Sequence, residues 1–269
     1  MTNGEQGGIR KHKWQELWDG WQAVLRRNHV LGRARRGDFD PLLADAEAAL
    51  NSAVWGFGSD HPETGRKLAA LAAVHAMRGE SNPATALYRR AIGILSLVHK
   101  SDRAELTALR EQFAAFLHGI GDFVGAEKEY EALVSSEQTR HSNRPRAVTA
   151  RLMDALAQTR SAQGNSAGAK AGHRDALLCW EAVCGPGSPE VARCLTHLAS
   201  LYLSERRYDE AEPLLLRAVA EWKSSPNPHD LYAVITLSCC GDLYRSTGRG
   251  NEARGVEATA KAMLSRYAK

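Results

Sequence analysis

The sequence predicts an all-α fold, an α-solenoid of about six antiparallel helix hairpins. Three observations support this prediction: a turn recurs along the whole chain, small residues recur at fixed distances from it, and no strand-like alternation competes with the helical periodicity. Successive turns are separated by 42, 42, 43, 42 and 42 residues. The turn positions are Gly37, Gly79, Gly121, Gly164, Arg206 and Gly248.

Small side chains occupy three registers relative to these turns. Five residues after the turn stand Leu42, Ala84, Ala126, Ala169, Ala211 and Ala253. Twelve residues after it stand Ala49, Ala91, Leu133, Ala176, Ala218 and Ala260, and seven before it Val30, Ala72, Ala114, Ala157, Ala199 and Gly241. Because the distance between packed helices depends on the side chains at their contact, we expect these registers to be buried between helices.

The hairpins follow one another without a dividing linker. A flexible tail at 1–11 precedes a single domain at 12–269, whose repeats occupy about 12–57, 58–100, 101–142, 143–185, 186–227 and 228–269. Loops such as GFGSDHPE (56–63) and CGPGSPE (184–190) separate them. The turn glycine suits a left-handed helix end, and the polar residue three positions later is expected to cap the second helix. These expected caps are Asp40, Asn82, Asp209 and Asn251, with Pro41 and Pro83 in the first turn.

Composition excludes several classes of protein. Apolar residues make up 43% and charged residues 25%, as in ordinary globular proteins. Neither a membrane-spanning run nor a signal peptide is visible, and five cysteines do not form a secreted disulfide framework, so we expect a cytoplasmic protein. The net charge of +4 is spread along the chain and does not indicate nucleic-acid binding. The alanine- and arginine-rich composition is compatible with a bacterial source.

The stretch LASLYLSERRYDEAEPLLLRA (198–218), together with His61-Pro62 and Ser188-Pro189-Glu190-Val191-Ala192, resembles the tetratricopeptide repeat of the kinesin light chain type. The resemblance covers about residues 20–266. It implies a right-handed superhelix whose first helices line a concave groove for an extended peptide, so the expected partner is a protein. In that family, asparagine pairs in the groove hold the peptide backbone; here only Asn28 keeps an asparagine.

The resemblance also places the register thirteen residues before each turn in the groove. Arginine occupies it at Arg66, Arg151 and Arg193, and guanidinium groups bind carboxylates bidentately, which favours an acidic partner segment. The alternative is a solvated face whose charges pair internally, because Glu111 and Asp154 lie nearby. The candidate groove residues are Arg27, Asn28, Arg66, Gln112, Arg151, Asp154, Arg193, His197 and Arg245.

Both ends of the chain carry apolar side chains. Trp14, Trp18 and Trp21 lie on one face of a predicted helix, which either caps the solenoid or binds a partner. At the other end, the helix with Met263 and Leu264 has no further helix to cover it. That apolar face is either lightly exposed or used for self-association.

No catalytic cluster, phosphate-binding loop or cofactor motif is recognisable. His197, Cys194 and Cys239 could approach one another as metal ligands, but ordinary packing of these residues is favoured and no metal is expected. Trp180 and Trp222 are expected to pack between repeats. The sequence therefore predicts a non-catalytic adaptor that binds a protein or peptide through its groove. The alternative is a sensor of a ligand or peptide, whose superhelix changes shape on binding.

Overall fold

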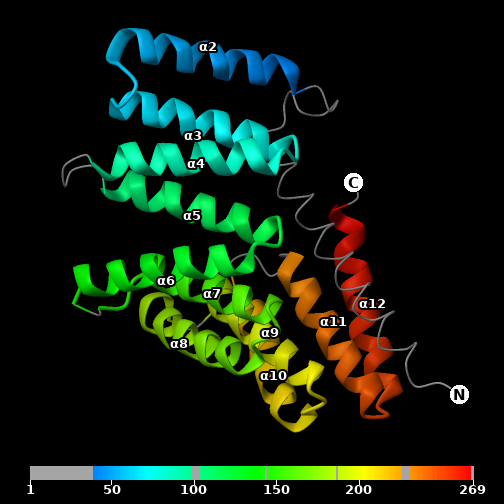
Figure 1. Cartoon of the computed structure of the whole chain (residues 1–269). Coiled ribbons are helices and arrows are strands. Elements are labelled where there is room, and N and C mark those ends of the chain that lie inside the picture. Colours follow the sequence, from blue (N-terminus) through cyan, green and yellow to red (C-terminus); the bar gives the residue numbers. More distant parts are fainter. Residues whose placement is uncertain (1–38, 98–102, 143, 186, 226–230, 268–269) are drawn as a thin grey trace, which may run out of the picture. The chain divides into compact units, whose positions relative to one another are not determined.

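The computed structural model describes residues 39–97, 103–142, 144–185, 187–225 and 231–267, which form an all-α helical repeat fold without strands. The predicted fold class is confirmed over this part of the chain (Figure 1). The first helix of the first hairpin falls outside it. So do the predicted tail and the candidate residues Trp14, Trp18, Trp21, Arg27 and Asn28.

The chain divides into two compact units, at residues 1–102 and 103–269. In the first unit, α2 (Asp40–Phe57) contacts α3 (Pro62–Met77), which pairs with α4 (Ser81–Ser96). The predicted single solenoid domain, its repeat boundaries and its superhelical hand stay predictions.

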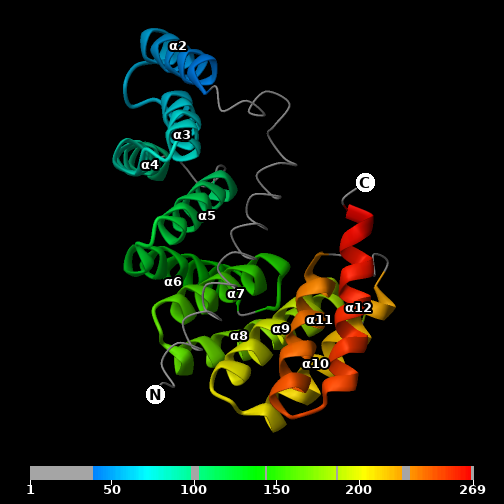
Figure 2. The same ribbon diagram turned by 90° about the vertical axis from the view of Figure 1, so that its right-hand side faces the viewer.

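The second unit is a stack of four hairpins. Its helices are α5 (Arg103–Gly119), α6 (Phe123–Arg140), α7 (Ala147–Ala162), α8 (Ser166–Cys184), α9 (Pro189–Ser204), α10 (Tyr208–Ser224), α11 (Leu231–Ser246) and α12 (Gly250–Tyr267). Each helix packs on the next in sequence, and α9 also contacts α7 and α11 (Figures 1 and 2). The first helices of three successive hairpins are therefore neighbours and form one continuous face.

The turns confirm the predicted repeat. Gly79, Gly121, Gly164 and Gly248 all have positive φ, between 79° and 84°. Arg206 takes the same left-handed conformation, with φ 61°, although its side chain makes that conformation costly. The five turns share one backbone geometry, and four of them use glycine, which adopts it without steric penalty.

The small-residue registers are buried, as predicted, from Ala72 onward, whereas Leu42 and Ala49 of α2 are only half-buried because the helix expected to cover them lies outside the described residues. No more than 2% of the alanine side chain is exposed at the register five residues after the turn, from Ala84 to Ala253. The register seven residues before the turn is equally closed from Ala72 to Ala199. At one crossing, a Cβ placed on Gly172 of α8 would lie only 2.9 Å from the Cβ of Ala157 on α7. The helices of a hairpin thus approach too closely there for any larger side chain.

The predicted positions of the helix caps are wrong. The second helices begin two residues after the turn, so the cap is the residue that directly follows it. Asp122 and Asn165 each accept a hydrogen bond at 2.9 Å from the backbone N–H three residues later. Asn82, Asp209 and Asn251 therefore lie inside the first helical turn, and Asp40 begins α2. A single left-handed residue reverses the chain, which leaves no room for a longer connection.

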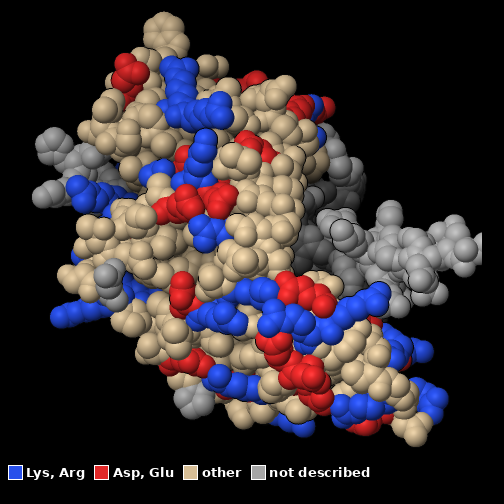
Figure 3. Space-filling view, turned by 60° about the horizontal axis from the view of Figure 1, so that its bottom comes forward, with Lys and Arg blue, Asp and Glu red and all other residues tan. Residues whose placement is uncertain are grey.

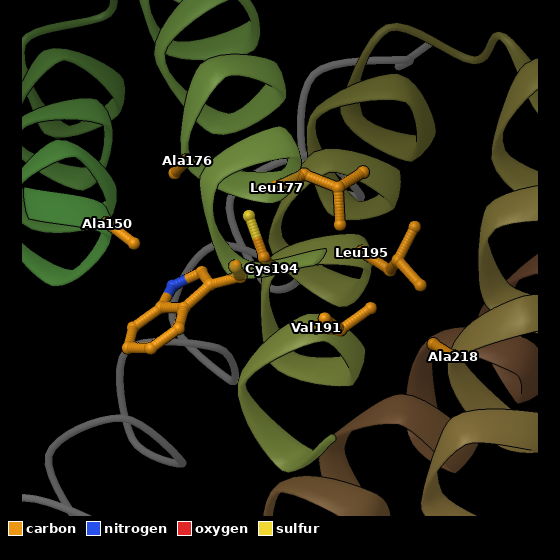
Figure 4. Close-up of a cluster of buried hydrophobic side chains, with 8 residues drawn as sticks. Ala150, Ala176, Leu177, Val191, Cys194, Leu195 and Ala218 are labelled. Atoms are coloured by element: carbon orange, nitrogen blue, oxygen red, sulfur yellow. The ribbon is translucent and has the colours of Figure 1, made fainter. Parts of the chain in front are cut away.

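The predicted core residues are buried. Trp180 and Trp222 are 5% and 4% exposed, and Trp222 Nε1 donates to Thr236 Oγ1 at 2.9 Å. Trp180 belongs to a cluster with Ala150, Leu177 and other side chains of α7 to α10 (Figure 4). Cys240 is 2% exposed, also as predicted. None of the described helices is long and apolar enough to cross a membrane.

Candidate functional site

The face formed by the first helices of the second unit carries the candidate groove residues. On α7, Arg151 donates through Nη2 to Glu111 Oε2 of α5 at 2.8 Å. Half of the Arg151 side chain is exposed, at 53%. This ion pair joins two neighbouring first helices, and a partner carboxylate that bound Arg151 would have to compete with Glu111.

Arg193 on α9 is held more loosely. Its Nε lies 3.9 Å from Asp154 Oδ2, beyond hydrogen-bonding distance, and its guanidinium lies 5.5 Å from the centre of the Tyr232 ring on α11. Within the described part of the chain, no hydrogen bond joins this guanidinium to another side chain. The Asp154 carboxylate is shared with other donors, so its charge is only partly available to Arg193.

Of the remaining candidates, the two arginines pair with nearby carboxylates, and Gln112 carries no charge. Arg66, in the first unit, donates to Glu63 Oε2 at 3.1 Å. Arg245 on α11 pairs with Asp242 at 2.6 Å and with Glu257. Gln112 is exposed on α5. Figure 3 shows one side of the molecule, on which basic and acidic side chains are interspersed.

Asp154 is the centre of a buried polar cluster and is only 3% exposed. Its Oδ1 atom accepts hydrogen bonds from His173 Nδ1 on α8, at 2.9 Å, and from His197 Nδ1 on α9, at 3.3 Å. Its Oδ2 atom accepts from Gln158 Nε2 at 3.1 Å. Cys194 on α9 donates through Sγ to the backbone carbonyl of His173 at 3.1 Å. Four polar side chains from three helices thus surround one carboxylate.

The protonation states in this cluster follow from burial and hydrogen bonding. Burial opposes ionisation of Asp154, but the charge of His197 and the hydrogen bonds from His173 and His197 hold its pKa well below the usual value. Burial lowers the pKa of His173, and the hydrogen bond to Asp154 offsets this only in part. Burial, reinforced by the Asp154 charge, raises the pKa of the Cys194 thiol. The cluster at neutral pH therefore contains a carboxylate, a neutral His173 and a thiol.

Sequence reasoning found Asp154, His197 and Cys194 but missed His173. A signal for His173 is present in the sequence, because this histidine stands nine residues after its turn, in the second helix. At the same register other repeats have Tyr88, Tyr130, Leu215 and Glu257. His173 is 1% exposed at this position. Cys239, considered together with His197 and Cys194, packs instead among Ala199, Leu215 and other apolar side chains. Its register matches that of His197, but it lies one repeat farther along the stack.

Comparison with known proteins supports the repeat assignment. The tetratricopeptide repeat family model matches residues 148–220, which span α7 to α10. Among solved structures, BtubC (BKLC) from P. vanneervenii is 21% identical, with a TM-score of 0.71 over 86% of this chain and 92% of that one. Residues 148–220 match the tetratricopeptide repeat, and the chain has the tetratricopeptide repeat fold.

Two further structures share this tetratricopeptide repeat fold. The nearly identical TPR-like repeats assigned to a kinesin light chain in Podosopora anserina are 18% identical, with a TM-score of 0.61 over 77% of this chain and 98% of that one. The pilF protein of Pseudomonas aeruginosa is 18% identical, with a TM-score of 0.54 over 94% and 92%. At these identities the likeness shows the fold. No curated protein sequence matches the chain.

The tetratricopeptide repeat fold supports a general role in binding other proteins, because stacked hairpins present a long surface built from neighbouring repeats. Proteins of this fold are generally non-catalytic scaffolds. The particular surface that binds, and the chemistry of its partner, depend on the side chains that this chain places on its first helices.

Proposed function

We propose that this tetratricopeptide repeat protein is a non-catalytic adaptor that binds an acidic segment of a partner protein on the first-helix face of its second unit. Arg193 is the main contact in this proposal, and Arg151 is a secondary one. The observation that supports it most directly is the loose pairing of Arg193, whose nearest carboxylate oxygen is 3.9 Å away and belongs to the shared Asp154.

The surroundings of Arg193 suit a carboxylate ligand. The Tyr232 ring supports one face of the guanidinium, which restricts its motion before a ligand arrives. Its side chain is 26% exposed and can therefore be reached from solvent. A carboxylate that binds Arg193 bidentately would gain two charge-assisted hydrogen bonds without breaking an existing one. Arg151, in contrast, must first leave Glu111.

A binding assay with defined peptides tests this proposal. Fluorescent peptides rich in Asp and Glu are compared with peptides of the same length in which each acid is replaced by its amide, and fluorescence anisotropy gives Kd. We expect the acidic peptides to bind. Arg193→Glu should weaken their binding roughly 10–150-fold, because hydrogen bonds to charged groups contribute about 1.5–3 kcal/mol.

Arg217→Glu is the matched control. Arg217 lies on a second helix, α10, and pairs with Glu181 at 2.5 Å, so this variant has the same change in charge on a different face. It should bind acidic peptides nearly as well as the unaltered protein. The proposal fails if acidic and amide peptides bind equally, or if the two variants weaken binding by the same factor.

A further inference from the structure

The buried cluster around Asp154 contains the side chains from which proteins build transition-metal sites. One ligand atom each of Asp154, His173 and Cys194 lies within 4.8 Å of the other two, and all three residues are buried. His197 adds a second imidazole, with its Nδ1 atom 3.3 Å from Asp154 Oδ1. The four side chains offer one carboxylate oxygen, two imidazole nitrogens and one sulfur. Zinc accepts nitrogen, sulfur and oxygen ligands from these residue types and is usually four-coordinate.

From this arrangement we propose that Asp154, His173, Cys194 and His197 bind a single divalent transition metal ion of the zinc type. The proposal does not rest on peptide binding, although Asp154 also lies 3.9 Å from Arg193. It joins two successive hairpins, because Asp154 and His173 come from α7 and α8 while Cys194 and His197 come from α9.

Ligand atoms of Asp154, His173 and Cys194 are already grouped, and His197, which contacts Asp154, must turn toward the other two to complete the site. Ligand atoms of a tetrahedral zinc site lie roughly 3.3–3.6 Å apart, given metal–ligand bonds of about 2.0–2.3 Å. The contacts of Asp154 Oδ1 with the two histidines already fall at 2.9 and 3.3 Å. The longest separation among Asp154, His173 and Cys194 must shorten from at most 4.8 Å, which rotation of the Cys194 thiol and a tilt of the His173 ring can supply.

Charge balance also favours a divalent ion. On binding, the Cys194 thiol proton leaves to solvent, and the metal takes the place of the Nδ1 protons of His173 and His197, whose rings then carry their protons on Nε2. The carboxylate and the thiolate together neutralise a charge of +2, so the buried centre has no net charge. The metal ion forms four bonds and no electrons are transferred.

A supporting contact and an entry path are both present. Gln158 Nε2 donates to Asp154 Oδ2 at 3.1 Å, which holds the carboxylate with Oδ1 turned toward the histidines. Hydrogen bonds of this kind orient metal ligands and affect metal affinity. The His197 side chain is 15% exposed, so an ion can reach the cluster past this ring from the first-helix face.

The repeat registers show that this set of residues is specific to one place in the chain. Cys194 lies twelve residues before its turn, where the two preceding repeats have Leu109 and Leu152. At the register of His173, two earlier repeats have a tyrosine, Tyr88 and Tyr130. The last repeat has Thr236 and Glu257 at these two registers, so polar side chains occur there elsewhere. Among the described repeats, only this place combines a thiol and an imidazole at the two registers beside a buried carboxylate, which is the combination that a metal ion would use.

Cobalt substitution of the full-length protein tests the site. The protein is treated with a chelator, dialysed and titrated with Co²⁺ and then Zn²⁺, and its absorption spectrum is recorded. We expect one Co²⁺ per chain, with a thiolate-to-cobalt charge-transfer band and the visible bands of a four-coordinate ion, which Zn²⁺ then displaces. Zinc should also raise Tm, because a ligand that binds only the folded state stabilises it.

Two cysteine variants separate the site from general thiol binding. Cys194→Ala should lose the charge-transfer band and weaken zinc binding by more than the ~10–100-fold typical of a lost outer contact. Cys239→Ala is the matched control, because Cys239 is equally buried, at 1%, and like Cys194 packs among apolar side chains, but it does not belong to the group of ligand atoms around Asp154. It should keep the full cobalt spectrum. Circular dichroism verifies that both variants are folded.

The proposal is overturned if the unaltered protein binds no cobalt at one equivalent. It is also overturned if the charge-transfer band persists in Cys194→Ala, or if Cys239→Ala loses it to the same extent. Gln158→Leu adds a graded readout: it should weaken zinc about 10–100-fold while the cobalt spectrum at saturation stays unchanged.

Discussion

A buried carboxylate such as Asp154 requires compensation, because transfer of an isolated charge from water to a protein interior is strongly unfavourable. Here two imidazoles and an amide supply hydrogen bonds, and Arg193 supplies a positive charge at 3.9 Å. Removal of any one donor would leave part of this charge uncompensated. The same residues therefore link the packing of α7, α8 and α9 to the chemistry of the first-helix face.

The close approach of α7 and α8 at Gly172 gives a prediction about a single residue. Gly172→Ala should destabilise the protein by about 1–3 kcal/mol, since the new Cβ would lie 2.9 Å from the Cβ of Ala157 and one helix would have to move. Urea unfolding followed by circular dichroism measures the change in the free energy of unfolding.

The control for this prediction is a helical glycine in open space. A Cβ on Gly255, in α12, has no neighbour within 4 Å, so Gly255→Ala should stabilise the protein by about 0.5–1 kcal/mol through helix propensity alone. Opposite signs for the two variants are expected. If both variants stabilised the protein, the close approach at Gly172 would have no energetic significance.

Among secondary-structure elements, the hairpin turn is the most uniform feature of the structure. Its left-handed residue follows the end of the first helix. The next residue directly precedes the second helix and, where it is Asp122 or Asn165, caps it. In the α9–α10 turn, the backbone N–H of Arg207 donates to the Tyr202 carbonyl at 2.9 Å, and the corresponding bond in the α7–α8 turn, from Asn165 to Arg160, is also 2.9 Å. The arginine turn thus has the same hydrogen bonding as a glycine turn, in spite of the strain at Arg206.

That comparison predicts opposite effects of exchanging the two residue types. Arg206→Gly should stabilise the protein by about 0.5–1 kcal/mol, because it removes a left-handed non-glycine residue, which costs about 1–2 kcal/mol, at some cost in chain entropy. Gly164→Arg, in the equivalent turn, should destabilise it by about 1–2 kcal/mol. Thermal unfolding of the two variants checks both values, and an unchanged Tm in both would contradict the strain argument.

On the scale of the whole molecule, each of the two units is a stack in which helices contact mainly their neighbours in sequence. Stability in such stacks is approximately a sum of repeat and interface contributions, so opening of one hairpin need not unfold the others. In the second unit, α12 packs on α11, and its Met263 is buried with Trp222 and Ala233. The interior helices α7 to α10 are instead covered on both sides.

Amide hydrogen exchange should reflect this difference. We expect α12 to exchange faster than α7 to α10, and Met263→Ala, which removes a buried side chain at a cost of about 2–5 kcal/mol, to increase exchange chiefly in α11 and α12. Mass spectrometry of peptides from each helix provides the measurement. Leu264→Ala is the control, since Leu264 is 43% exposed and should change little. Equal acceleration along the whole second unit would contradict a nearest-neighbour stack.

The sequence was sufficient for the repeat, its turns and the residues that close the helix contacts. The repeat has a fixed length, and turn conformation and helix spacing depend on residues close in sequence, such as Gly164, Ala157 and Ala169. The predicted cap positions were two residues too late, because the number of residues in the turn depends on how the two helices pack in three dimensions.

The meeting of Asp154, His173, Cys194 and His197 could be recognised only in three dimensions. His173 comes from a second helix, and its side chain reaches Asp154 because the rotation of α8 about its axis directs that register inward. Sequence spacing shows which residues share a helix face, but the crossing of two helices and the rotation of each are set by the packing of the whole hairpin. The partners of a buried polar group therefore depend on tertiary packing, whereas the repeat that contains it is visible in the sequence.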